Sequence, residues 1–384
     1  MDATSLRLRL RMGRWLRSLR QGVWSARREL GWPFALLLFG VLFQQLAALL
    51  PEFTERFYVR SIYPRLLGFV SLFSRGFDFS VGEIVFCVLL TAALICVVRF
   101  CVLMYRRPLE RVRRVVFFTR CALWVAVAIM WAFLLSFGFN YQRPPLFVLL
   151  GYEQRSASAA ELEAMSREVV VGINESFEQA HADGRTAPGR EELVALLQES
   201  YNAAGDLTLL PKGDYAGPKP LFFSELMSRL GISGIYFPFT GEPNYNADAP
   251  DFQLPFSMAH EMAHQRGVAR ESEANFVAYL VCINSRDPFV RYSGYRNGLG
   301  VIGELYRLEP EKARELAKQL GPGYREDSRR AALFWAKAGG AFGSLGLRVN
   351  DLYLRANRVK AGAADYRNSM ALIIGYYLRK TTRE

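Results

Sequence analysis

Three long apolar stretches within the first 140 residues constrain the fold of this chain more than any other feature. They run from Pro33 to Leu50, from Val81 to Met104 and from Val116 to Phe139. As helices of about 18–24 residues they would be roughly 27–36 Å long, which is enough to cross the hydrocarbon core of a bilayer. Buried helices of a soluble protein are the alternative, but three such runs in succession favour membrane spans.

The net charge of +12 is distributed as in a membrane protein. Arginines are concentrated before the first apolar stretch and between the second and the third, the segments that the positive-inside rule keeps in the cytoplasm. We therefore predict a lipid bilayer as partner and no nucleic acid. The predicted regions are a basic cytoplasmic N-terminus (1–31), a membrane region (32–140) with helices at about 33–50, 81–104 and 116–139, and an extracytoplasmic domain (141–384).

The sequence after residue 140 has a mostly helical pattern. A Ser-x-x-Glu capping box at Ser158 predicts a helix over 158–181, and a second helix is expected over 190–204. Residues 205–253 are typical of loops with one or two short strands. Cys282 is the only cysteine in this region, and its apolar neighbours indicate a small buried side chain. The predicted fold class is mainly α: three transmembrane helices followed by a mostly helical α+β domain.

The stretch 257-SMAHEMAHQRGVARESEANF-276 contains two of the three histidines in the chain. His260 and His264 share one face of a helix, so both imidazoles can bind one metal ion. Glu261 lies about 100° further round, where it can take a proton from a water molecule at that metal. Zinc suits this chemistry because three protein ligands leave a position for water. Pro255 and Gly267 are placed to begin and end the helix.

The third ligand is less directly readable. Arg270 occupies the position six residues after His264, where a third histidine would be needed in one common arrangement, and His181 is some eighty residues upstream. A carboxylate is the better candidate, and Glu271 and Glu273 both follow the glycine turn. They cannot face the same way, because two residues correspond to about 200° of rotation on a helix. We favour Glu271 and keep Glu273 as the alternative.

A first resemblance concerns the residues after this helix. Glu-x-x-Ala-Asn, here Glu271 to Asn275, is similar to the pattern in ImmA/IrrE-type peptidases and other gluzincins. The resemblance implies a zincin-like domain in which Glu271 binds zinc and Asn275 supports a histidine ligand from behind. The sequence departs from most gluzincins in spacing, since only six residues separate His264 from Glu271.

A second resemblance covers much more of the chain. The three apolar stretches ending in 139-FNYQRPPL-146, the stretch 219-KPLFFSELMSRLGISGIYFPFTGEPNYNADAPDF-252 and 350-NDLYLRAN-357 resemble an uncharacterised bacterial family of membrane-anchored proteins. Its members are assigned to the zinc-peptidase superfamily. The resemblance implies the bacterial inner (cytoplasmic) membrane as location and names no substrate.

The segment preceding the motif suggests how a peptide could be bound. Gly234 to Phe239 could form an edge strand to which the backbone of a substrate adds as a further strand, although a structural hairpin is an equal alternative. The donor that stabilises the oxyanion is not readable from the sequence. The candidates are Tyr236, Tyr353, Tyr366, Arg270 and His181.

Together these features predict a membrane-anchored zinc metallopeptidase, an endopeptidase acting on a protein or peptide substrate outside the cytoplasm. One Zn2+ per chain would be bound by His260, His264 and Glu271, with Glu261 as general base. The alternative is a non-catalytic scaffold or envelope-assembly factor with a structural or degenerate metal site. An intramembrane protease is disfavoured by 248-DAPDFQLPF-256, whose acids and prolines do not fit a span.

Overall fold

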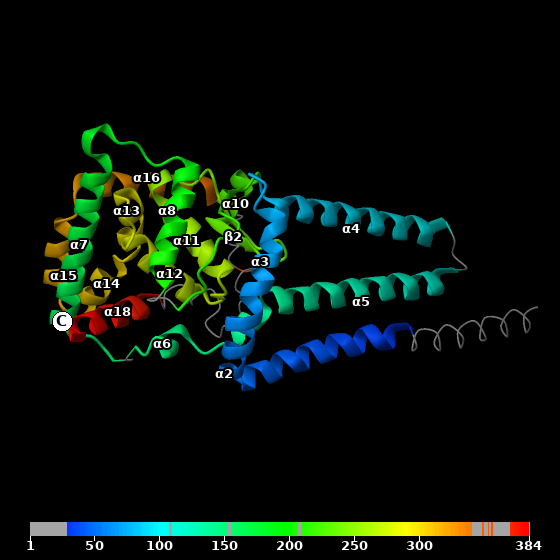
Figure 1. The fold of residues 1–384 in the computed structure, drawn as a ribbon. Helices are drawn as coiled ribbons and strands as arrows, with labels where there is room; N and C mark the ends of the chain where they lie inside the picture. Colours follow the sequence, from blue (N-terminus) through cyan, green and yellow to red (C-terminus); the bar gives the residue numbers. More distant parts are fainter. Residues whose placement is uncertain are drawn as a thin grey trace, which may run out of the picture. The chain divides into compact units, whose positions relative to one another are not determined.

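The computed structural model describes residues 29–106, 110–152, 155–205, 209–339, 348, 352, 355 and 369–383 (Figure 1). The chain forms two compact units. The first contains the chain up to Leu49 together with Ile84–Leu135, and the second contains Leu50–Glu83 together with Ser136–Glu384. Most of the predicted basic N-terminus, residues 1–28, lies outside the described residues.

Three helices are long and apolar enough to cross a membrane. They are Glu29–Leu49, α4 (Val81–Arg106) and α5 (Arg111–Ser136). At most 11% of their most apolar windows is buried within the protein, so these side chains are available to lipid. The three helices indicate a multi-pass membrane protein, in agreement with the sequence.

The ends of the third of these helices differ from the predicted ones. α5 begins at Arg111 rather than Val116, because arginine is a good helix former and the helix continues beyond its apolar part. It ends at Ser136 rather than Phe139, since Phe137 leaves the helical region with φ −159° and ψ −37°. The 3₁₀ helix η3 (Gly138–Gln142) follows and is buried in the second unit.

The segment between the first two candidate spans is helical and belongs to the second unit. It consists of α2 (Pro51–Phe53), the π-helical stretch η1 (Thr54–Ile62) and α3 (Tyr63–Ser74). One face of this segment is buried. The buried Glu55 forms an ion pair with the buried Arg143, with Nε and Oε2 2.9 Å apart, and thereby joins η1 to the residues after η3.

Helices α7 (Ala159–His181) and α8 (Arg190–Ala203) occur where the sequence predicts them. The capping box at the start of α7 is formed. The N–H of Glu161 donates to Ser158 Oγ at 3.3 Å, and the N–H of Ser158 donates to Glu161 Oε2 at 2.8 Å. Two of the N–H groups that lack a partner at a helix start are satisfied in this way.

A small sheet precedes the motif helix. Its strands β1 (Lys219–Pro220), β2 (Gly234–Phe237) and β3 (Glu242–Tyr245) are arranged in the order β1-β3-β2. β1 pairs parallel to β3, and β2 pairs antiparallel to β3 with Ile235 opposite Asn244. β2 lies at the edge of this sheet and forms a hairpin with β3, so both alternatives for Gly234 to Phe239 fit the structure, and the strand ends at Phe237 rather than Phe239.

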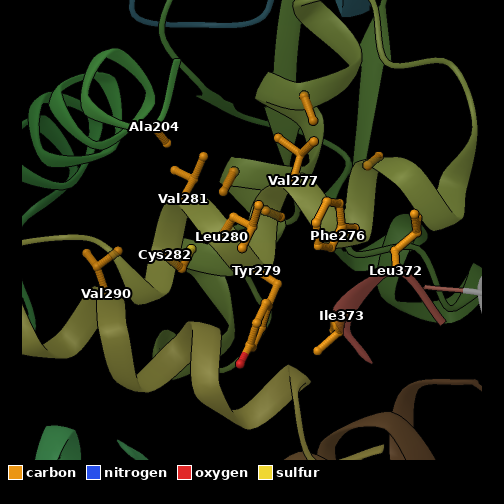
Figure 2. Packing of buried hydrophobic residues seen from close by; sticks show 14 of the residues in the cluster. Ala204, Phe276, Val277, Tyr279, Leu280, Val281, Cys282, Val290, Leu372 and Ile373 are labelled. Carbon is orange, nitrogen blue, oxygen red and sulfur yellow. The ribbon is translucent and has the colours of Figure 1, made fainter. Parts of the chain in front are cut away.

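The core of the second unit surrounds α12 (Glu271–Ile283), as Figure 2 shows. Phe276 to Cys282 are completely buried, so this short apolar run is a core helix. Leu372 and Ile373 of α18 (Ser369–Arg383) contribute to the same cluster. Cys282 is completely buried, as predicted from its apolar neighbours, and burial raises the pKa of its thiol.

The remaining elements complete a mainly helical unit. They are α6 (Leu146–Leu149), η4 (Ala182–Gly184), α10 (Ser224–Leu230), η5 (Asp251–Gln253), α11 (Leu254–Gln265), α13 (Pro288–Asn297), α14 (Gly300–Leu308), α15 (Pro310–Lys318) and α16 (Pro322–Gly339). The predicted fold class is confirmed: three long apolar helices precede a helical domain that contains a three-stranded sheet.

Candidate metal centre

The motif lies on α11, whose two ends have the predicted residues. Pro255 is in the first turn, where its missing N–H breaks no hydrogen bond. Gly267 follows the helix with φ +90°, a conformation that a side chain would strain. A Cβ at Gly267 would also lie 3.1 Å from Tyr63 Cε1 and 3.3 Å from Asn140 Oδ1, so these neighbours would have to move by a few tenths of an ångström. The sharp turn lets α12 start at Glu271, with only six residues between it and His264.

His260, His264 and Glu271 converge in a buried group that could hold a metal ion. The two Nε2 atoms are 3.0 Å apart. Glu271 Oε2 lies 3.1 Å from Nε2 of His260 and 3.4 Å from Nε2 of His264. One atom from each of three side chains therefore faces a common point.

Each imidazole is oriented by a partner behind it. His260 Nδ1 lies 2.9 Å from Asn275 Oδ1, and His264 Nδ1 lies 2.7 Å from the carbonyl oxygen of Val268. Oxygen atoms of this kind accept a hydrogen bond, so Nδ1 carries the proton in both rings and Nε2 presents its lone pair. Support of this type fixes the tautomer that a metal ligand needs.

The donor set fits a small tetrahedral cation. Two ligand atoms about 2.0–2.2 Å from a tetrahedral zinc ion would lie roughly 3.3–3.6 Å from each other. The observed separations of 3.0, 3.1 and 3.4 Å differ from this by a few tenths of an ångström at most. Two nitrogen donors and one carboxylate leave a fourth position open, as catalytic zinc sites do.

The charges at this site favour a cation. Burial raises the pKa of Glu271, but the two imidazoles outweigh it and hold this pKa well below its ordinary value. Burial lowers the pKa of His264, whereas the carboxylate of Glu271 reverses this effect and raises it to about 9. A carboxylate that binds a proton on the neighbouring imidazole so strongly would also attract a metal cation.

Glu273 faces elsewhere. Its Oε1 accepts hydrogen bonds from the N–H of Leu146 at 2.8 Å and from Nη1 of Arg270 at 3.0 Å. Arg270 also donates to the carbonyl oxygens of Tyr141 and Arg143. The structure thus brings Glu271 to the histidines, whereas Glu273 and Arg270 bind the end of η3 and the residues that follow it.

Glu261 lies beside the three convergent side chains and is buried. Burial raises the pKa of Glu261 to about 6, although the two histidines oppose this effect. Gly234 of the edge strand β2 packs directly on its carboxylate. A Cβ at Gly234 would be 2.7 Å from Glu261 Oε1 and 2.8 Å from the carbonyl oxygen of Asn244, so only glycine allows the strand this close.

Sequence reasoning missed an aromatic group that covers the end of α11. The hydroxyl of Tyr63, from α3, donates to the carbonyl oxygen of Gln265 at 2.8 Å and lies 3.3 Å from the hydroxyl of Tyr236. The ring of Phe137 packs between Tyr236 and His264, with centroid distances of 5.3 and 6.1 Å. No local spacing in the sequence relates these residues to the motif.

The oxyanion candidates are found in different surroundings. Tyr236 is close to the site through Phe137, and burial raises its pKa. His181 is exposed, stacks on Phe177 and is bonded to the carbonyl oxygen of that residue. Arg270 is engaged with Glu273 as described above. Tyr353 and Tyr366 lie outside the described residues.

Fold and site together define a class: a multi-pass membrane protein whose helical domain carries a buried candidate metal centre. The chain belongs to the family described as "Protein of unknown function (DUF3810)", whose model matches residues 58–374. The match includes the whole candidate site and confirms the resemblance to an uncharacterised family. Searches of the curated proteins and of the solved structures gave no match.

Proposed function

We propose that this protein is a membrane-anchored zinc metallopeptidase that hydrolyses peptide bonds outside the cytoplasm. The observation that carries the proposal is the convergence of His260, His264 and Glu271 on one point with a fourth titratable group, Glu261, directly beside it. A structural metal site has no use for this additional carboxylate. A hydrolase needs it as a base.

The proposed chemistry assigns one role to each side chain. His260, His264 and Glu271 hold one zinc ion per chain, and Asn275 keeps the first histidine oriented. When bound, zinc polarises a peptide carbonyl and lowers the pKa of a water molecule towards ~7. Glu261 accepts a proton from the attacking water and later delivers it to the leaving amine. Burial raises the pKa of Glu261 above that of an ordinary carboxyl group, which favours the uptake and release of a proton at this position.

The edge strand supplies a way to hold the substrate. Among the residues that the structure describes, β2 pairs with β3 alone, and its first residue, Gly234, lies against Glu261. An extended peptide that adds to this edge would bring its own carbonyl groups past the carboxylate. On this proposal, replacing Ile235 by proline raises the KM for a peptide substrate while the protein remains folded.

The proposed orientation has the N-terminus in the cytoplasm and the site outside. One compact unit combines Leu50–Glu83 with the chain from Ser136 onward, and two candidate spans separate these parts in the sequence. Two crossings return the chain to the side of the membrane from which it left, so both parts can reach the same side. The clusters of arginine in the other loops favour the outside for this unit.

The metal content of the purified full-length protein tests the proposal. We expect about one zinc ion per chain in the wild type. The Glu271→Gln variant should lose it, whereas Glu273→Gln should retain it because Glu273 binds Leu146 and Arg270 instead. A wild type that stays free of metal after reconstitution with zinc would refute the site. Bound zinc without hydrolysis of any peptide in a library would favour the scaffold alternative.

A further inference from the structure

The segment between the first two candidate spans exposes an unusual number of large apolar side chains. Within 30 residues, nine of them are exposed: Leu50, Phe53, Phe57, Ile62, Phe69, Leu72, Phe73, Phe77 and Phe79. A soluble surface carries such residues singly, whereas a contiguous set marks a surface that is covered by a partner or by lipid.

The opposite face of this segment is already occupied. Tyr58, Tyr63 and Leu67 are buried, and Tyr63 binds the carbonyl oxygen of Gln265. Ser74 Oγ donates to the carbonyl oxygen of Thr240 at 2.8 Å. The segment is therefore fixed to the unit that carries the site, and its exposed phenylalanines cannot turn inward without breaking these contacts.

Exposed cations lie among the exposed phenylalanines. Arg56, Arg60, Arg65 and Arg75 are all exposed. Of the three acidic residues, Glu52 and Asp78 are exposed and Glu55 is buried with Arg143, so exposed arginines outnumber exposed carboxylates. Arginine side chains that border an apolar surface are typical of helices lying in the headgroup region, where they reach lipid phosphates.

A second exposed aromatic residue, Phe222, is bound through its backbone N–H to the first turn of α4. Both carboxylate oxygens of Glu83, in the first turn of α4, accept backbone hydrogen bonds at 2.8 and 2.9 Å from Phe222 and Phe223. The ring of Phe222 is 86% exposed. The buried Glu242 accepts hydrogen bonds from the N–H groups of Val81 and Gly82, which holds the β2–β3 hairpin at the same turn.

We propose that these two groups form one lipid-binding surface, which seats the domain on the bilayer. The surface consists of the exposed residues of Leu50–Phe79 together with Phe222. The occupant is the interfacial layer of the membrane rather than a soluble protein, because both ends of the segment continue directly into candidate spans. The helix Glu29–Leu49 ends one residue before it, and α4 begins at Val81.

The position of this segment at the membrane surface follows from its covalent connection to a candidate span at each end. A segment of 30 residues whose two ends enter the same bilayer surface stays close to that surface, and a face rich in phenylalanine and arginine is stable in the interfacial layer. Because Tyr63 and Glu242 join this segment and the start of α4 to α11 and the sheet, the candidate site is held close to the membrane.

Site-directed spin labelling tests the surface directly. The full chain, with its exposed cysteines replaced by serine, is labelled singly at F53C, F73C or F222C and reconstituted in phosphatidylethanolamine vesicles containing phosphatidylglycerol. Collision with oxygen, which partitions into lipid, is compared with collision with a water-soluble nickel chelate. The control label is at L308C, an exposed apolar position on α14 in the same unit.

We expect labels at the three phenylalanine positions to lose accessibility to nickel and to keep accessibility to oxygen, while the control remains accessible to both. Nickel accessibility equal to that of the control would overturn the proposal. Protection from both reagents would also overturn it, since that pattern indicates cover by protein, including a second copy of the chain. The measurement needs neither zinc in the candidate site nor turnover, so its result is independent of the proposed peptidase activity.

Discussion

Two buried glutamates of the same unit, Glu242 and Glu261, have opposite surroundings. Glu242 accepts hydrogen bonds from Lys219 Nζ at 2.5 Å, from Val81 N–H at 3.1 Å and from Gly82 N–H at 2.6 Å. Glu261 receives no hydrogen bond from any residue that the structure describes. It instead faces two imidazoles and a second carboxylate, and burial raises its pKa.

The difference separates a structural charge from a reactive one. A buried carboxylate that is fully paired is held in one protonation state and one position, and its energy contributes to the fold. A buried carboxylate without donors lowers the stability of the fold when it is ionised, and its raised pKa leaves it ready to exchange a proton. Matched substitutions at the two positions therefore provide a test of function against structure.

The largest expected effect is on turnover at Glu261. Glu261→Gln should lower peptide hydrolysis about 10²–10⁴-fold, the usual contribution of a general base, because the amide cannot accept the proton. Zinc content and melting temperature should remain near those of the wild type. A quenched fluorescent peptide library with protein in nanodiscs provides the measurement. A variant that retains activity would remove Glu261 from the mechanism.

The matched substitution at Glu242 should act on stability. Glu242→Gln leaves the ammonium of Lys219 buried without its anion, which typically costs about 3–5 kcal/mol in the free energy of unfolding. Denaturant unfolding in detergent provides the measurement. If Glu242→Gln unfolds like the wild type while losing activity, the assignment of Glu242 to structure is wrong.

Gly234 tests how closely the strand and the base are packed. Gly234→Ala inserts a methyl group where Glu261 Oε1 and the Asn244 carbonyl would be under 3 Å away. We expect a loss of activity of about 100-fold, as a displacement near 1 Å can produce, with zinc retained. Ser233→Ala, one residue earlier, is the control. Full activity in Gly234→Ala would show that β2 can shift to accommodate the methyl group without disturbing Glu261.

Asn275 should influence metal binding more weakly. Asn275→Ala removes the acceptor behind His260, and loss of such a partner commonly weakens metal affinity about 10–100-fold. Competition with a zinc chelator measures this change. Asn275→Asp retains an acceptor and should retain affinity. Equal affinities in all three proteins would remove Asn275 from the site.

The smallest expected effect lies away from the site, at the capping box. Ser158→Ala should cost about 1 kcal/mol in the free energy of unfolding.

Hydrogen bonds from Arg155 and from Ser158 lower the pKa of Glu161 to about 2. The stabilisation by ionised Glu161 is therefore complete above pH 4.5 and lost as the pH falls towards 2. If Glu161→Gln lowers the free energy of unfolding, relative to the wild type, by the same amount at pH 2 as at pH 7, this pH dependence is wrong.

The parts that sequence predicts best are those set by local spacing. The four-residue interval between His260 and His264, the Ser158 capping box and the turn at Gly267 depend only on helix geometry and backbone sterics. The helical rotation that separates Glu271 from Glu273 also shows that they face differently, but which one faces the histidines depends on the angle between α11 and α12.

The remaining features arise from contacts between distant residues. Tyr63 covers the end of α11, the carbonyl of Val268 orients His264, and Gly234 packs on Glu261. A backbone carbonyl carries no sequence signature, and tyrosine and glycine occur in many other roles. The sequence of residues 51–80 likewise has no local pattern that relates this segment to the domain of the site.

The hydrogen bond between Tyr63 and Gln265 joins residues 202 positions apart, with two candidate spans between them. At about 5–20 residues per second of synthesis, Tyr63 waits roughly 10–40 s before its partner exists. The contact that Tyr63 makes with α11 therefore forms only after Gln265 has been synthesised. A chain shortened to residues 141–384 lacks Tyr63, which binds the carbonyl oxygen of Gln265 and lies against the turn at Gly267. We expect such a fragment to aggregate, even though it contains every proposed zinc ligand.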